Sequence, residues 1–323
     1  MWKYIAKRLL MMIPVVIGVT FLVFFIMNIK PGDPGRMVLG LDASQEAVNA
    51  YNAKLGLNQP YLVRYMKFLG GLLHGDLGNS WYGGDPVIDN IKKMFPVTVK
   101  IAVLAIIFAT VVGVPIGVLS AVKQYSLGDR IASIFAMMIA STPSFWLCLL
   151  LLLIFSVRLG WLPPYGLTTW KHYIMPVFVL GANTLGMCIR MTRTSMLEEI
   201  RQDYIRTARA KGMNEGRVIF VHALYNSLIP VITAVGTNFS LLLGATVYVE
   251  SIFALSGLGN YLIKAVNAKD IPIVMGCITV LAIATVLINL IIDLLYAAID
   301  PRIKAQYIGT KNTKTKKEGK EIG

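Results

Sequence analysis

Side chains that could do chemistry are few and scattered in this chain. His74 and Asp76 lie in the Gly-rich run HGDLGNS, but a metal site needs a third and usually a fourth ligand nearby. The run also lacks the Gly-Lys-Ser/Thr ending of a phosphate-binding loop. The three cysteines fall inside apolar blocks without CxxC or Cys/His spacing: Cys148, Cys188 and Cys277. The sequence therefore predicts no catalytic, cofactor-binding or metal-binding residue.

One charge-rich segment, 203–230, stands between two strongly apolar blocks. Its first part predicts a short amphipathic helix, because one helical face would hold Ile200, Tyr204, Ile205 and Ala208. Gly212 supplies a permissive backbone at the end of that helix, and Asn214 is a suitable N-cap for a second helix. The apolar side of the second helix would hold Val218, Ile219 and Leu224. We expect a bent helical pair outside the membrane, although a solvated basic loop would also fit the charges.

Composition sets the class of protein that must position this segment. Of 323 residues, 56% are hydrophobic and only 15% are charged, and the mean hydropathy is +0.64. A soluble domain of this length would be much less apolar. The sequence predicts an all-α polytopic membrane protein.

Six apolar segments are long enough to cross a bilayer. They are 9–29, 101–122, 131–157, 174–190, 228–249 and 272–298. The first could also be a cleaved signal peptide, but it is long for one, and no small-x-small cleavage site precedes the PGDPG that follows. We therefore expect a retained first helix. Kinks are expected at three prolines: Pro115, Pro143 and Pro176.

The remaining regions give the domain organisation. Residues 1–29 hold the N-terminus and first span, and 30–100 are mixed in composition, with helices expected near 44–55 and 61–73. This predicts a small extracytoplasmic domain between the first two spans. The core would be 101–298, including a cytoplasmic loop at 196–229, and 299–323 would be a basic tail, disordered from about Tyr307.

Basic residues predict the orientation of the chain. The N-terminus, two short loops and the tail on one side hold 19 Lys and Arg residues, whereas the opposite short loops hold 4. Positive charge is retained on the cytoplasmic side, so both termini and the loop at 196–229 are expected in the cytoplasm. The net charge of +14 then reflects topology and attraction to anionic lipids, and no nucleic-acid motif accompanies it.

The spans are nearly free of ionisable residues, which ion-coupled transporters commonly keep at the midplane. Energy for transport would have to come from elsewhere, yet the chain has no GxxxxGK[ST] loop. Any ATPase must be a separate subunit. Two other classes stay open, namely a secondary transporter or channel acting alone, and a membrane anchor or receptor subunit.

Polar residues inside the spans have two interpretations. Small hydroxyl and amide side chains most often pack helix against helix in membranes. As a set they could instead line a translocation path that hydrogen-bonds peptide groups with little side-chain discrimination. The candidates for such a path are Ser141, Thr142, Asn183, Thr237 and Asn238.

Ordered detail in the charged loop resembles a known family. RTARAKG at 206–212 and HALYN at 222–226 look like the cytoplasmic coupling loop of ABC importer permeases, in the dipeptide/oligopeptide/nickel permease branch. The superfamily loop opens Glu-Ala-Ala, but Arg206 stands at the Glu position, Thr207 at the first Ala, and only Ala208 matches. Four further segments are similar to the same branch: IKPGDPG, HGDLG, VESIFALSGLG and DLLYAAIDPRIK.

This resemblance implies a B-type peptide permease subunit with six transmembrane helices in the type I importer fold. It also implies a second homologous permease subunit, two ATPase subunits that bind ATP and Mg, and an external solute-binding protein in a bacterial or archaeal cell membrane. The permease would not be an enzyme, and closure of the ATPases would move the coupling loop as a lever on the fourth and fifth spans.

The resemblance also implies roles for individual residues. The coupling loop would use Arg206, Thr207, Ala208, Arg209, Ala210, Lys211, Gly212, Met213 and Asn214. An external gate would use Ile252, Phe253 and Leu258. Di- and oligopeptides are the expected solutes, and nickel, metal chelates and glutathione are alternatives within the same family.

The orientation can be tested with two single-cysteine variants, Ser44→Cys and Asn214→Cys, treated with an impermeant thiol reagent on intact cells. The charge asymmetry predicts labelling at position 44 and none at position 214 until the cells are opened. The parent protein serves as the blank, because its cysteines lie in apolar blocks. External labelling at position 214 would reverse the predicted topology.

Overall fold

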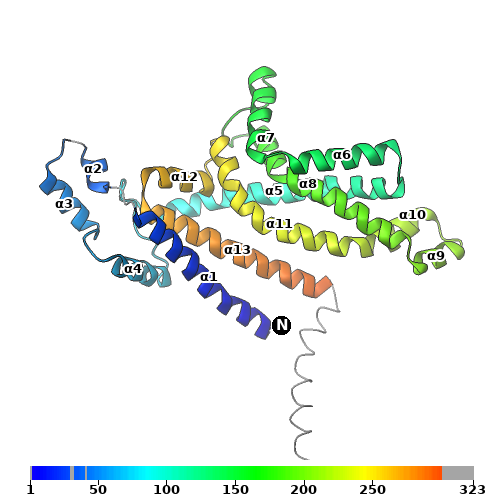
Figure 1. Ribbon diagram of the computed structural model, residues 1–323, viewed down its shortest axis with the longest axis horizontal. Coiled ribbons are helices and arrows are strands. Elements are labelled where there is room, and N and C mark those ends of the chain that lie inside the picture. The colour runs from blue at the N-terminus through cyan, green and yellow to red at the C-terminus, as the bar shows by residue number, and fades with distance from the viewer. Residues whose placement is uncertain (1, 30–32, 41, 300–323) are drawn as a thin grey trace, which may run out of the picture. The chain divides into compact units, whose positions relative to one another are not determined.

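The computed structural model describes residues 2–29, 33–40 and 42–299, and this part of the chain is helical without a β-strand. Five helices are apolar and long enough to cross a membrane, and a broken helix pair brings the total to six if it counts as one span. The five are α1 (Trp2–Ile29), α5 (Val87–Val122), α8 (Lys171–Ile200), α11 (Leu224–Ile252) and α13 (Ile271–Ile299). Figure 1 shows them as the longest rods of the chain. The predicted all-α membrane fold is confirmed.

The third predicted span is interrupted. Helix α6 (Leu127–Ser141) ends where α7 (Ser144–Leu151) begins, and α7 continues as the π-helical segment η1 (Leu152–Arg158). Pro143 stands at the N-cap of α7 with ψ 127°. Proline cannot donate a backbone hydrogen bond and disfavours helical geometry in the residue before it. The kink expected at Pro143 is therefore a full break, at which the two helices bend by 103°.

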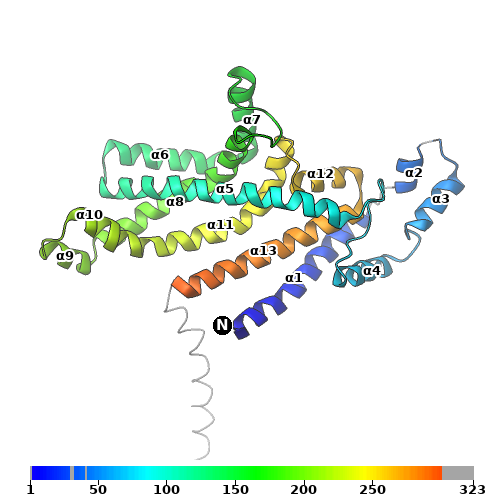
Figure 2. The same ribbon diagram turned by 180° about the vertical axis from the view of Figure 1, so that it is seen from behind.

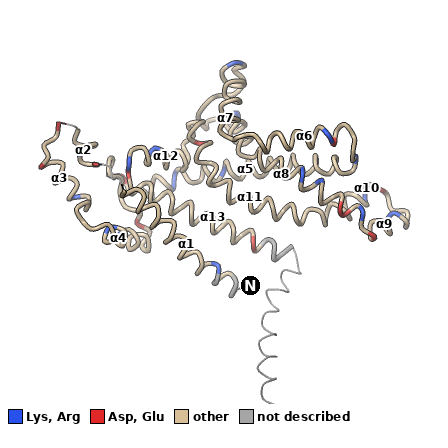
Figure 3. Tube along the Cα trace, in the orientation of Figure 1, with Lys and Arg blue, Asp and Glu red and all other residues tan. Residues whose placement is uncertain are grey.

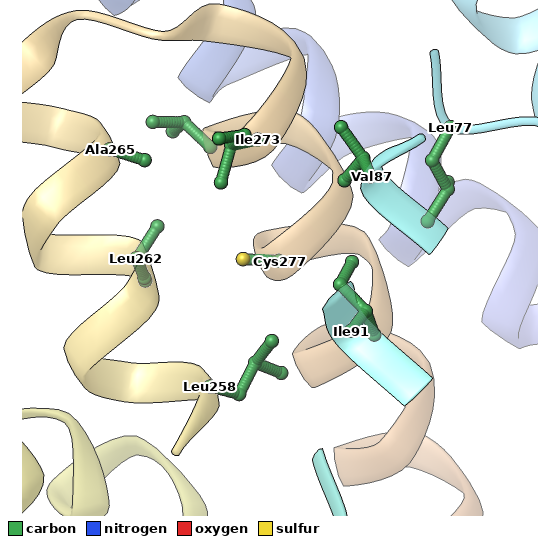
Figure 4. Close-up of a cluster of buried hydrophobic side chains, with 9 residues drawn as sticks. Leu77, Val87, Ile91, Leu258, Leu262, Ala265, Ile273 and Cys277 are labelled. Carbon is green, nitrogen blue, oxygen red and sulfur yellow. The ribbon is translucent and has the colours of Figure 1, made fainter. Parts of the chain in front are cut away.

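Helix α5 begins at Val87, well before the predicted start of the second span at 101. Its first turns carry charge, but Val87 and Ile91 also belong to a buried apolar cluster that includes Leu258, Leu262 and Cys277 (Figure 4). Burial of this face extends the helix beyond its apolar segment, because tertiary packing stabilises helix that sequence hydropathy alone does not predict.

By contacts the chain divides into two compact units. Unit 1 comprises Met1–Ile107, Thr142–Gly181 and Leu241–Val286, and unit 2 comprises Phe108–Ser141, Ala182–Ser240 and Leu287–Gly323. The tail predicted at 299–323 lies almost wholly outside the described residues.

Besides α7, the short helices of unit 1 are α2 (Pro34–Leu39), α3 (Gln45–Lys54), α4 (Tyr61–Leu73) and α12 (Leu258–Ala268). Helices α3 and α4 confirm the two predicted near 44–55 and 61–73. Ser44 is the N-cap of α3, and its Oγ accepts a hydrogen bond from the Ala47 N–H at 3.2 Å, as expected of an N-cap serine.

The Gly-rich run after α4 is a loop held by a buried aspartate. Ser80 Oγ donates to Asp270 Oδ2 at 2.6 Å, and the Trp81 N–H donates to the same oxygen at 3.1 Å. Burial raises the pKa of Asp270, and the Ser80 hydrogen bond opposes that shift. The run 74–80 therefore has a structural role, which fixes the loop to the start of α13.

A second buried carboxylate orders α12. Glu250 has no exposed surface, and its Oε2 accepts hydrogen bonds from the Gly259 N–H at 2.7 Å and the Asn260 N–H at 3.1 Å. A side-chain acceptor at a helix N-terminus satisfies donors that the helix leaves free. Gly257 and Gly259 leave no space for a Cβ beside this carboxylate, which explains why the segment VESIFALSGLG carries glycines there.

In unit 2 the helices α5 and α8 approach closely. A Cβ at Gly117 would lie 2.6 Å from Thr192 Cβ and 2.8 Å from the Ile189 carbonyl oxygen, and one at Gly113 would lie 2.7 Å from Cys188 Cβ. Real Cβ atoms do not come this near to other atoms. Small residues at such contacts let membrane helices pack backbone to backbone.

A buried ion pair fixes the turn between α5 and α6 to α8. Arg193 donates from Nε to Asp129 Oδ1 at 2.6 Å and from Nη2 to Oδ2 at 2.9 Å. Asp129 is 4% exposed and also accepts from the Ser120 hydroxyl and from the Tyr125 N–H at 2.9 Å. The carboxylate is thus fully hydrogen-bonded, as a buried charge must be.

Gly117→Ala tests the α5–α8 contact, with Gly244→Ala on α11 as the matched control. The new methyl at 117 must displace Thr192 or the α8 backbone, whereas a Cβ at 244 meets nothing within 4 Å. We expect Gly117→Ala to lower the free energy of unfolding by about 1–3 kcal/mol, as overpacking does. Denaturation of the purified protein in detergent measures it. Equal stability of the two variants would contradict the close contact.

Candidate functional site

The charge-rich segment forms a hooked group of short helices in unit 2. Helix α8 is followed by α9 (Asp203–Ala210), then by α10 (Glu215–Arg217), and the π-helical segment η2 (Val218–Ala223) leads into α11. Figure 2 shows α9 and α10 together at the joined ends of α8 and α11. Charged residues gather on α9 and α10, whereas the middle of α11 is nearly free of them (Figure 3). The predicted bend between two helices is confirmed, but the second one continues without a break from Glu215 to Ile252. The position of this group outside the membrane stays a prediction.

One side of this group is buried. Ile205 and Ala208 of α9 pack with Val218, Ile219 and Ala223 of η2. The same cluster includes Met196 of α8 and two residues of α5, Val118 and Ala121. Tyr204 was predicted on the apolar face of α9, but 41% of its surface is exposed. The group is therefore attached through an apolar core to the ends of three long helices.

Gly212 makes the turn between α9 and α10. Its φ is +75°, a region that favours glycine. The Gly212 N–H donates to the Arg209 carbonyl at 2.9 Å, and the Met213 N–H donates to the Ala208 carbonyl at 3.3 Å, so both close the end of α9. Asn214 then caps α10 by accepting the Gly216 N–H at 2.8 Å. Both signals predicted from the sequence are confirmed.

A bidentate ion pair closes this turn from outside. Arg209 donates from Nη2 to Glu215 Oε1 at 2.6 Å and from Nε to Oε2 at 3.0 Å. The hydrogen bonds to Glu215 raise the pKa of Arg209. Glu215 was not among the predicted residues, although opposite charges on either side of Gly212 are a usable signal. An exposed pair adds little stability, so its effect is to fix the shape of the turn.

Tyr204 joins the two ends of the segment. Its hydroxyl donates to Glu199 Oε2 at 2.5 Å and accepts from Asn226 Nδ2 at 2.9 Å. Partial burial, and then the Glu199 carboxylate, raise the pKa of Tyr204. Glu199 lies on α8 and Asn226 on α11, so one hydroxyl connects the helix before the segment to the helix after it. Sequence spacing did not indicate this contact.

Most of the predicted loop residues lie on the surface. The exposed ones are Arg206, Thr207, Arg209, Ala210, Lys211, Gly212 and Asn214, while Met213 is half-buried. Ala208 differs, since its side chain belongs to the buried cluster. The exposed side of the group is therefore basic, with Arg206, Arg209 and Lys211 on its surface.

The predicted path residues lie at two places in the structure, on α8 and α11 and at the break between α6 and α7. Asn238 of α11 donates to the Ala234 carbonyl at 3.0 Å and to Met187 Sδ of α8 at 2.9 Å. Asn183 is exposed one turn before Met187 on α8, and Thr237 is exposed and bonded to the Thr233 carbonyl. Ser141 and Thr142 lie at the break between α6 and α7. The printed contacts thus join Asn238 of α11 to α8 one turn from Asn183, and a path lined by the predicted residues stays a prediction.

The predicted gate residues are packed inside unit 1. Phe253 and Leu258 are 1% and 0% exposed, and Ile252 is half-buried. The Leu258 N–H donates to Thr98 Oγ1 at 2.8 Å. The short element that was expected after the fifth span is α12, and a gate role for these residues stays a prediction.

Comparisons with known proteins agree with this architecture. The family model described as binding-protein-dependent transport system inner membrane component matches residues 113–305. A second model, for the N-terminal part of such membrane components, matches residues 1–102. Together they cover nearly the whole chain.

Individual relatives are similar over their full length. The chain is 41% identical to the dipeptide transport system permease protein DppB of Alkalihalophilus pseudofirmus, over 94% of this chain and 100% of that protein. It is 39% identical to the glutathione transport system permease protein GsiC of Salmonella paratyphi A, over 94% of this chain and 99% of that protein.

Among solved structures, an inward-facing MetNI methionine ABC transporter superposes with a TM-score of 0.56 at 21% identity, over 65% of this chain and 96% of that chain. At this identity the likeness shows the type I importer fold alone. Permeases of this kind work with ATPase and solute-binding partners. The chain belongs to the family of binding-protein-dependent ABC transport permeases, as a multi-pass membrane subunit.

Proposed function

We propose that this chain is a permease subunit of an ATP-driven importer of di- or oligopeptides and that it forms half of the translocation path. The observation that carries the proposal is the end-to-end alignment at 41% identity with a dipeptide permease. Glutathione, itself a small peptide, is the solute named for relatives at 39% identity. Import of glutathione is therefore the second candidate, and nickel or metal chelates follow from the family resemblance alone.

The complex would contain a second, homologous permease subunit, two ATPase subunits and a solute-binding protein. ATP and Mg would be held by the ATPases, and this chain would bind no cofactor and catalyse no covalent reaction. The bacterial relatives support a bacterial or archaeal cell membrane, and the charge asymmetry supports an orientation with both termini and α9–α10 in the cytoplasm. A secondary transporter acting alone would need intramembrane charges that the spans largely lack.

Coupling would run through the turn at Gly212. Exposed basic residues, including Arg206 and Lys211, would meet polar or acidic groups of an ATPase groove. The ion pair Arg209–Glu215 keeps the turn closed, and the apolar cluster behind it contacts α5, α8 and η2. Movement of the ATPases would then displace the ends of these helices as one body.

The coupling proposal is tested by Gly212→Pro, with Gly216→Ala as the matched glycine control. Proline fixes φ near −65°, which the +75° backbone at 212 cannot accept, whereas Gly216 has an ordinary backbone. We expect normal amounts of assembled complex and a loss of at least tenfold in labelled-dipeptide uptake per complex for Gly212→Pro. Uptake in proteoliposomes with the binding protein and ATP measures it, and glutathione and nickel salts serve as competitors.

A charge reversal refines the same test. Arg209→Glu should repel Glu215 and lower coupling, and the double change Arg209→Glu with Glu215→Arg restores the pair. Recovery in the double variant assigns Arg209 to the shape of the turn, and continued loss assigns it to the ATPase contact. Normal uptake with Gly212→Pro and Arg209→Glu would remove the turn from the mechanism.

The path proposal is tested by Asn238→Leu, with Ser240→Ala as the packing control. Ser240 Oγ donates to Asn289 Oδ1 of α13 at 2.6 Å, so its loss removes one interhelical hydrogen bond, worth about 0.6 kcal/mol on average. If Asn238 lines the path, uptake per assembled complex falls in Asn238→Leu but not in Ser240→Ala. Unchanged turnover in Asn238→Leu would leave it as a packing residue.

A further inference from the structure

Helix α4 has an apolar stripe that nothing in the described part of the chain covers. Leu62, Met66 and Leu73 recur at helical spacing and are 67%, 61% and 87% exposed. The adjacent side of the helix is packed, with Tyr65 only 5% exposed. Large exposed apolar side chains in a row on one helix mark a contact surface rather than a solvated face.

The residues of α1 that α4 contacts show how deep in the bilayer the apolar stripe lies. Tyr65 Oη donates to the Ile17 carbonyl at 2.9 Å and lies 3.0 Å from Thr20 Oγ1. The apolar span of α1 is Arg8–Ile29, so Thr20 lies nine residues from its end, or about 13 Å at 1.5 Å per residue. That is nearly half of a hydrocarbon core of about 30 Å. Tyr65 therefore reaches well inside the bilayer.

The aromatic contacts of Tyr65 place its ring, and the helix that carries it, nearer to the membrane surface than its hydroxyl. Its ring centroid is 5.3 Å from that of Phe21 and 5.4 Å from that of Phe24. These residues belong to the C-terminal half of α1. Helix α4 thus lies beside that half of α1, at the depth where interfacial helices insert their apolar sides, about 5–10 Å below the headgroups.

The stripe is continuous with the lipid-facing surface of α1. Phe25 and Ile26 of α1 are 60% and 54% exposed, as expected of side chains that meet lipid. An apolar cavity of about 480 Å³ lies between the two helices and is lined by Phe21, Phe24, Phe25, Ile29, Leu62 and Tyr65, among others. A groove of this size and chemistry suits an acyl chain.

The third side of α4 is basic. Arg64 and Lys67 line a separate cavity of about 420 Å³, together with Lys54 and Asp76. The Arg64 guanidinium carbon lies 5.7 Å from the Phe24 ring centroid. A basic edge next to an apolar stripe is the pattern of a helix that lies in the membrane interface.

We propose that α4 is an interfacial helix whose stripe of Leu62, Met66 and Leu73 contacts the acyl chains of the leaflet around the C-terminal half of α1. The inference requires that α1 spans the membrane, and it is independent of the transported solute and of which side is cytoplasmic. A segment counted with the extracytoplasmic domain is then part of the membrane body of the permease.

Single nitroxide labels test the proposal on the assembled complex in lipid vesicles. They are placed at Leu62→Cys, Met66→Cys and Leu73→Cys, with Phe25→Cys as the lipid reference and Glu46→Cys on α3 as the water reference. The native cysteines are buried, so the parent gives the background. Collision rates with oxygen, which concentrates in lipid, and with a water-soluble nickel chelate are compared.

We expect positions 62, 66 and 73 to behave like position 25, with an oxygen-to-chelate collision ratio several-fold above that at position 46. A chelate rate at 66 equal to that at 46 would place the stripe in water and overturn the proposal. Low rates for both reagents would show that a protein subunit covers the stripe, and would overturn it equally. Because uptake is not measured, none of these outcomes depends on the proposed function.

Discussion

In unit 2, α5 and α8 touch through their backbones, because Gly113 and Gly117 leave no side chain between them. Helices inside a bilayer gain little hydrophobic free energy from one another, since lipid is as apolar as their side chains. Their association depends on close packing and on satisfied polar contacts. One helical turn beyond Ile189, Arg193 adds such a contact to Asp129. These contacts hold the last turns of α8, from which α9 follows, against α5 and α6.

Unit 1 is also held together by buried polar contacts, which two carboxyl groups make. Glu250 binds the first N–H groups of α12, and Asp270 binds the loop before α5. In each case one carboxylate satisfies backbone or hydroxyl donors of a segment that does not cross the membrane. These two carboxylates let short, irregular segments pack against the long helices without leaving donors unpaired.

The sequence predicted what local patterns determine. Apolar runs gave the long helices, and Ser44, Gly212 and Asn214 marked where short helices begin or end. It did not predict the start of α5 at Val87, because that depends on packing against α12 and α13. The pair Arg209–Glu215 and the contacts of Tyr204 join residues across turns. No hydrophobic period encodes such contacts, so only the folded chain shows them.

The hydroxyl of Tyr204 has a consequence for how this segment can vary. It closes a ring that runs from Glu199 through α9, the turn and η2 to Asn226. Inserting or deleting one residue inside the ring would rotate every later residue by about 100° around its helix. The apolar cluster and the hydroxyl contacts could not both re-form. This constraint fixes the length of this part of the chain, whereas the side chains on its outer surface are limited only by what they contact.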